Sequence, residues 1–82
     1  MIDVLYFAWL RERIGAPREE IESSAATVAE LVEELKARSD AHALAFSDMA
    51  SVRVAVDQAM VEMSADIGGA REVAFFPPMT GG

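Results

Sequence analysis

One segment near the middle of the chain has a strong helical period, and apolar stretches typical of β-strands stand on both sides of it. The apolar residues of this segment recur every three to four positions and form one stripe; they are Val28, Leu31, Val32 and Leu35. Thr27, followed three residues later by Glu30, is a capping box that marks where a helix begins. The pattern predicts a helix at about residues 28–39 with one apolar face.

The stretches on either side of this helix have the composition of strands. Residues 1–10 (MIDVLYFAWL) are rich in large aliphatic and aromatic residues, so both faces of a strand there would be largely apolar. Residues 11–15 favour one helical turn that ends at Gly15, and residues 18–24 favour a short charged strand. After the helix, we predict a strand at 51–58, a turn at Asp57-Gln58, a short return strand at 59–63 and a last strand at 71–76.

This order of elements predicts an α+β domain. Two antiparallel strand pairs separated by one main helix indicate a β-grasp arrangement, a mixed sheet of about five strands with the helix packed on one face. The first and last strands would then be parallel neighbours in the middle of the sheet. Pro77 cannot donate a ladder hydrogen bond, so the predicted domain spans residues 1–76 and residues 77–82 form an extended, flexible C-terminal tail.

The composition excludes several classes of function. The 82 residues are enough for one domain. A net charge of −7 repels phosphate backbones and anionic head groups, so neither nucleic acid nor a membrane is an expected partner. The chain has no cysteine, and no apolar run approaches the ~20 residues of a membrane span, so we expect a cytoplasmic protein.

Residues that commonly carry out catalysis are scarce. The only histidine, His42, lies in an Ala-rich stretch with no clear pattern, and we interpret it as a solvated loop residue. Glu19 and Glu20 are interpreted as ordinary solvated charges, and no cluster has metal-ligand spacing, so no metal site is expected. Catalysis by this chain alone is therefore not expected.

The C-terminal stretch EVAFFPPMTGG points to another kind of chemistry. Pro77 and Pro78 favour a stiff, extended exit from the last strand, and Met79, Thr80, Gly81 and Gly82 follow. Six extended residues span roughly 20 Å, and glycines let a backbone enter a channel too narrow for a Cβ atom. The tail would be a thin probe that ends in a carboxylate. Adenylation by ATP would activate that carboxylate toward a sulfur donor, which gives a thiocarboxylate, or toward an amine.

The same stretch, together with MIDVLYFAWLRERIG at the other end, closely resembles the small subunit of molybdopterin synthase, a ubiquitin-like sulfur carrier. The resemblance implies that Gly82 is adenylated by a ubiquitin-activating-like adenylyltransferase and thiocarboxylated with sulfur from a sulfurtransferase. The tail would then donate sulfur to cyclic pyranopterin monophosphate in the large synthase subunit, within a heterotetramer. It implies no bound cofactor, because ATP is used by the activating partner. The segment GGARE departs from the family's acidic–Gly–acidic turn and leaves the local turn type open.

In a β-grasp domain the helix covers one sheet face, so the second apolar face of the first strand needs another cover. We predict that this face is a partner interface, and the resemblance adds an arginine to it. The predicted interface residues are Leu5, Phe7, Arg11, Met60, Phe75 and Phe76.

Three other functions fit the same tail. The chain could carry sulfur for another product, such as thiamine, an amino acid or a tRNA base. It could be a ubiquitin-like modifier joined to lysines, or a binding module whose tail is incidental. The sequence leaves these alternatives open.

Overall fold

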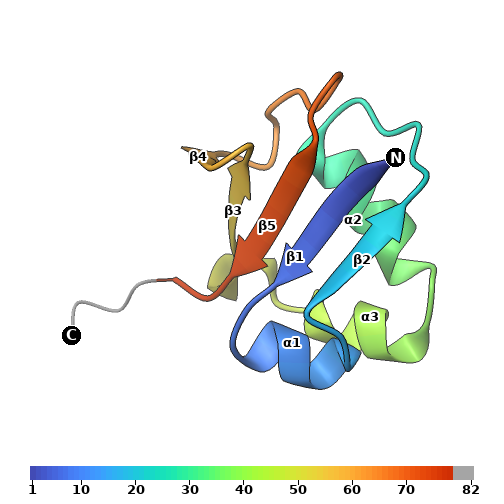
Figure 1. Ribbon diagram of the computed structural model, residues 1–82. Helices are drawn as coiled ribbons and strands as arrows, with labels where there is room; N and C mark the ends of the chain where they lie inside the picture. Colours follow the sequence, from blue (N-terminus) through green and yellow to red (C-terminus); the bar gives the residue numbers. More distant parts are fainter. Residues whose placement is uncertain (79–82) are drawn as a thin grey trace.

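The computed structural model describes residues 1–78 as a five-stranded sheet with three helices (Figure 1). In chain order the elements are β1 (Ile2–Tyr6), α1 (Trp9–Ile14), β2 (Arg18–Ile21), α2 (Val28–Lys36), α3 (Asp40–Ala45), a 3-10 turn (Met49–Ser51), β3 (Arg53–Val56), β4 (Ala59–Val61) and β5 (Glu72–Phe76). No helix among residues 1–78 is both long and apolar enough to cross a membrane.

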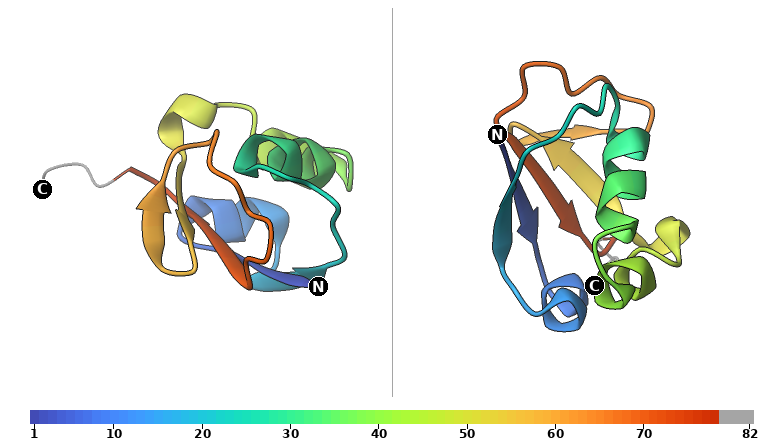
Figure 2. Two further views of the ribbon diagram at one scale, coloured as in Figure 1. Left: turned by 90° about the horizontal axis from the view of Figure 1, so that it is seen from above. Right: turned by 90° about the vertical axis from the view of Figure 1, so that its right-hand side faces the viewer.

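The sheet has the strand order β2-β1-β5-β3-β4. β1 and β5 pair in parallel at its centre, whereas β2, β3 and β4 join by antiparallel pairing. Helices α2 and α3 lie on one side of the sheet, and α1 lies at the end where β1 finishes (Figure 2). The predicted α+β β-grasp fold, with its parallel first and last strands, is therefore confirmed.

Helix α2 begins as the capping box predicts. The Thr27 hydroxyl accepts a hydrogen bond from the backbone N–H of Glu30 at 3.3 Å, and the whole predicted apolar stripe is buried. The helix ends at Lys36, before the predicted residue 39. The reason lies in Ser39, whose extended backbone interrupts the helix and whose hydroxyl accepts from the N–H of His42 to begin α3.

Strand β1 is shorter than the apolar run of residues 1–10. It ends at Tyr6, because the chain turns at Ala8 with a φ of 54°, and the N–H of Leu10 donates to the carbonyl of Phe7 at 3.2 Å. A positive φ strains a residue that has a Cβ atom. The burial of Leu10 in the core offsets this strain, and Gly15 ends α1 in the left-handed conformation as expected.

Two tight turns near the start of β5 hold this strand in register. Asp57 and Gln58 both have positive φ, which confirms the predicted turn between β3 and β4. The Asp57 carboxylate accepts hydrogen bonds from the backbone N–H groups of Arg71 and Glu72, each at 3.0 Å. A second turn spans Ile67 to Ala70, where the N–H of Ala70 donates to the carbonyl of Ile67 at 2.9 Å. Gly69, the third residue of this turn, has a φ of 79°, and a type II turn requires a positive φ at that position.

A partly buried polar cluster joins the edge strand β2 to β1 and α3, and it overturns two predictions. His42 is buried rather than solvated, and its Nε2–H donates to Glu19 Oε1 at 2.7 Å. The Tyr6 hydroxyl donates to the same oxygen at 2.8 Å. The Arg38 guanidinium lies 3.7 Å from the second carboxylate oxygen of Glu19, Oε2. The histidine Nδ1 and the Ser39 hydroxyl share a hydrogen bond at 2.7 Å. Glu19 therefore holds three elements together and is not an ordinary solvated charge.

The cluster shifts the pKa values of two of its members. Burial and the neighbouring Glu19 raise the pKa of the Tyr6 hydroxyl well above its ordinary value, so that hydroxyl remains a donor. Burial alone would raise the pKa of Glu19, but hydrogen bonds from His42 and Tyr6 and the charge of Arg38 outweigh it and lower that pKa below 4.5. Glu19 therefore stabilises the fold as an anion. That contribution is complete above pH 4.5 and is lost as the pH falls through the pKa of the folded state.

We predict that Glu19→Gln lowers the free energy of unfolding by about 1.5–3 kcal/mol at neutral pH, the usual range for hydrogen bonds to a charged group. The loss relative to wild type should shrink as the pH falls below 4.5, where Glu19 of the unfolded chain takes up a proton, and should level off below the lowered pKa of the folded state. Urea denaturation across this pH range measures both effects. The control is Glu20→Gln, an exposed neighbour on the other face of β2. Equal stability of the two variants at neutral pH would contradict the role given to Glu19.

Candidate functional site

The face of the sheet turned away from α2 and α3 carries an apolar row that crosses four strands. Leu5 of β1 pairs with Ala74 of β5, Ala74 with Ala55 of β3, and Ala55 with Met60 of β4. Neighbouring residues in a strand point to opposite faces, so this row alternates with the core residues Val4, Val73 and Val54 on the helix side. Within the row, the small side chains of Ala55 and Ala74 are also mostly covered, at 9% and 8% exposed. Met60 is 62% exposed. The ribbon shows no helix on this side of the sheet (Figure 2), so no described element covers Leu5 and Met60.

An aromatic pair extends the row toward the end of the sheet where the chain leaves β5. The rings of Phe7 and Phe76 meet edge to face with centroids 6.5 Å apart, and the N–H of Phe7 donates to the carbonyl of Phe75 at 3.1 Å. Phe7 remains 45% exposed. We call Leu5, Phe7, Met60 and Phe76 the open-face patch. The structure brings together these four of the six predicted interface residues.

Phe75 does not belong to the open-face patch, contrary to the prediction. Its side chain is 0% exposed, points to the helix side of β5 and packs edge to face against Phe46, with centroids 5.0 Å apart. Alternation along the strand requires this, because Phe75 and Phe76 must face opposite ways. Phe75 is a core residue.

Arg11 lies on α1, close in sequence to Phe7, and its side chain is exposed. Among residues 1–78, no carboxylate lies within 4.0 Å of its guanidinium group. The second arginine of α1, Arg13, stacks instead on Trp9, with its guanidinium carbon 4.8 Å from the ring centre. Arg11 is therefore available to a partner, and its role stays a prediction.

The predicted tail begins where the sheet ends. β5 stops at Phe76, and Pro77 and Pro78 follow without regular secondary structure, next in sequence to the open-face patch. The predicted roles of Met79, Thr80, Gly81 and Gly82 lie outside the described residues. The tail therefore starts beside Phe7 and Phe76.

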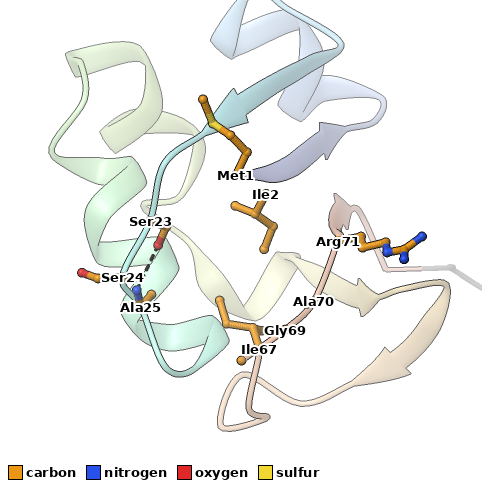
Figure 3. Close-up of a pocket in the computed structure, with 10 residues that line it drawn as sticks. Met1, Ile2, Ser23, Ser24, Ala25, Ile67, Gly69, Ala70 and Arg71 are labelled. Carbon is orange, nitrogen blue, oxygen red and sulfur yellow. Dashed lines mark hydrogen bonds between the residues drawn. The ribbon is translucent and has the colours of Figure 1, made fainter.

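The surface also has a shallow hollow at the opposite end of β5, near the N-terminus (Figure 3). Ser23 and Ser24 lie on one wall, and the turn at Gly68-Gly69 forms another. The Ser23 hydroxyl already forms hydrogen bonds within the protein, since it accepts from the N–H of Ala25 and donates to the Glu34 carboxylate. The guanidinium of Arg71 points away from the hollow (Figure 3). Within the described part of the chain, no group of three potential metal ligands gathers here or elsewhere.

Sequence reasoning missed three residues of this face. Ala55 and Ala74 complete the apolar row, and Arg53 pairs with Phe76 in the register of β3 and β5. The signal was present in the alternation of Val52, Val54 and Val56, which places Arg53 and Ala55 on the opposite face. The register that puts them beside Phe76 and Ala74 required the structure.

Comparison with known proteins decides the family. Residues 4–82 match the ThiS family. The chain belongs to the ThiS family. Over its full 82 residues this ThiS-family chain is 42% identical to the molybdopterin synthase sulfur carrier subunit of Escherichia coli (strain K12), covering 100% of both chains. It is 37% identical, again over 100% of both chains, to the molybdopterin synthase sulfur carrier subunit of Haemophilus influenzae (strain ATCC 51907 / DSM 11121 / KW20 / Rd).

Solved structures support the same assignment. A Pyrococcus furiosus protein assigned as molybdopterin converting factor, subunit 1, superimposes on this ThiS-family chain with a TM-score of 0.73 and 31% identity, over 95% of this chain and 97% of the other. SAMP1 from Haloferax volcanii gives a TM-score of 0.69 over 99% and 98% of the two chains. Because its sequence is only 23% identical, this second superposition shows a shared fold alone.

The adjacent phenylalanines of the ThiS-family chain allow a matched test of the two sheet faces. We predict that Phe75→Ala lowers the free energy of unfolding by about 3–5 kcal/mol, because it leaves a cavity in the core. Phe76→Ala should lower the free energy of unfolding by less than half that amount, since Phe76 is only partly buried. Urea denaturation of both variants measures the difference. A larger loss for Phe76→Ala would reverse the assignment of faces.

Proposed function

We propose that this chain is the sulfur carrier subunit of molybdopterin synthase. The observation that carries the proposal is its full-length identity of 42% to a protein of that name. The open-face patch supports it, because an exposed apolar surface next to the tail is what a docking carrier needs. In this role the chain is the sulfur donor of a complex and has no activity alone.

The proposed chemistry takes place at the Gly82 carboxylate. One carboxylate oxygen attacks the α-phosphorus of ATP, which releases pyrophosphate and gives an acyl-adenylate. A sulfur donor then attacks the acyl carbon and displaces AMP, so the C–O bond to AMP breaks as the C–S bond of a thiocarboxylate forms. The thiocarboxylate sulfur forms a C–S bond to cyclic pyranopterin monophosphate as an oxygen leaves that carbon. Water then cleaves the acyl–sulfur bond, which regenerates the Gly82 carboxylate and leaves the sulfur on the substrate, and two such transfers build the dithiolene of molybdopterin.

The partners follow from these steps. A ubiquitin-activating-like adenylyltransferase binds the ATP, a sulfurtransferase supplies sulfur, and the large synthase subunit receives the loaded tail in a heterotetramer. No cofactor is proposed for the carrier itself. We place this chemistry in the cytoplasm, in keeping with a chain that has no cysteine.

The open-face patch gives the carrier a means of presenting its tail. Docking through Phe7 and Phe76 would hold the start of the tail against the partner, and the following residues, roughly 20 Å when extended, would reach its active site. A stiff Pro77-Pro78 segment lowers the entropy lost when the tail is threaded. The carrier therefore separates docking, which uses the sheet, from chemistry, which uses the terminal carboxylate.

The proposal predicts a change in mass at the C-terminus. Incubation with the activating enzyme, ATP and a sulfur source should raise the intact mass by the difference between sulfur and oxygen. Deleting Gly82 should abolish this loading and leave the urea unfolding curve unchanged. Intact-mass spectrometry measures the loading, and a known carrier serves as the positive control.

The other candidate functions give different outcomes in the same system. A sulfur carrier of another pathway would load normally but fail to rescue a strain that lacks the molybdopterin subunit. A protein modifier would form conjugates on gels that survive reduction. An incidental tail would leave partner binding and cell phenotype intact after removal of Gly81 and Gly82. Any of these results would displace the synthase assignment.

We also predict that Phe7→Glu weakens binding to the large subunit by more than tenfold, because it places a charge in an apolar contact. The free domain should lose little stability, since Phe7 is 45% exposed. The control is Leu44→Glu, an apolar residue of α3 that is 59% exposed and outside the open-face patch. Isothermal titration calorimetry compares the affinities, and circular dichroism checks the fold. An unfolded Phe7→Glu variant would make Phe7 a core residue instead.

A further inference from the structure

The open face of the sheet is divided into three rows of different chemistry. The row nearest the start of β1 is acidic, since Asp3 pairs with both Glu20 and Glu72. The apolar row of Leu5, Ala74, Ala55 and Met60 comes next. The last row, where the tail begins, holds Phe7 and Phe76 with Arg53 opposite Phe76. The face thus changes from acidic at the start of β1 to apolar and aromatic toward the tail, where Arg53 lies.

Arg53 stands out in a chain with seven basic and fourteen acidic residues. Its side chain is exposed, and among residues 1–78 no carboxylate lies within 4.0 Å of its guanidinium. The other arginine at this sheet face, Arg18, is neutralised by Asp3 at 2.9 Å. Within the described part of the chain, the Arg53 guanidinium donates hydrogen bonds to the carbonyl oxygens of Ala50 and Val52, at 3.5 and 3.4 Å.

The acidic row of this face does little to neutralise the charge of Arg53. The acidic row lies four strand positions away from the row of Arg53, a separation of about 13 Å. That exceeds the screening length of about 8 Å at physiological ionic strength. Glu62 is nearer, because it lines the same shallow hollow as Arg53 and follows Val61, which pairs with Val54. Among residues 1–78 its carboxylate does not come within 4.0 Å of the guanidinium. Arg53 is therefore an exposed cation without a close ion-pair partner among the described residues, beside the aromatic pair at the base of the tail.

We propose that Arg53 is a specificity residue of the carrier, which pairs with a carboxylate of the large synthase subunit at the rim of the docking surface. The inference rests on the proposed function and adds a polar recognition element to the apolar patch. The neighbouring Phe76 would exclude water from the pair on docking, which strengthens it over a fully exposed ion pair. The acidic row at the far end of the same face would disfavour docking in the reversed orientation.

Arg53→Gln should weaken binding to the large subunit about three- to tenfold, and Arg53→Glu by more than tenfold, mainly through slower association. Both effects should diminish as salt is raised, because a rim charge is screened. Arg53→Lys should retain most of the affinity. The matched control is Arg71→Gln, which removes the same charge from an exposed arginine at the opposite end of β5 and should change the affinity less than twofold.

Surface plasmon resonance with the purified large subunit, over a series of salt concentrations, measures these effects, and urea unfolding verifies each variant. If wild type binds and the Arg53 and Arg71 variants respond alike, the role of Arg53 is overturned and the proposed function stands. If Arg53→Glu weakens binding equally at low and high salt, the side chain acts through packing and the ion pair is overturned. If wild type loads no sulfur and does not bind, both proposals fall.

Discussion

The parallel pairing of β1 with β5 is the constraint on which the rest of the molecule depends. It places the first and last strands of the chain side by side in the centre of the sheet, with Tyr6 opposite Phe75. Both strands therefore finish at the same end. Phe7, which follows β1, meets Phe76, which ends β5, and the tail starts beside this pair. Parallel neighbours require a long crossover, and the helices and remaining strands supply it.

The two faces of this sheet have different roles because only one is covered. The helix side holds the apolar core, including the stripe of α2 and the ring contact between Phe46 and Phe75. The open side has small residues at its centre, Ala55 and Ala74, with larger ones around them. Small central residues make a flat surface on which a partner can lie closely, whereas Phe7 and Met60 project from it. The same strands thus stabilise the domain on one side and present an apolar surface on the other.

A polar cluster completes the core where apolar packing would be weakest. β2 is a short edge strand of four residues, and three of them are charged. Glu19 attaches it to β1 and α3 through hydrogen bonds from Tyr6 and His42. A partly buried carboxylate loses part of its hydration, and here two donors and the nearby Arg38 compensate for that loss. The attachment also positions the end of β1, which leads directly into Phe7.

The sequence by itself determined the features that depend on neighbours along the chain. The capping box at Thr27, the stripe of α2, the turn at Asp57-Gln58 and the stop at Pro77 all follow from local backbone chemistry, and their order was enough to predict the β-grasp fold. Only the tertiary structure decided which of Phe75 and Phe76 is buried, that His42 reaches Glu19 from 23 residues away, and that Arg53 lies opposite Phe76. Strand alternation leaves the choice of face open until a helix covers one side, and contacts between distant residues have no local signal.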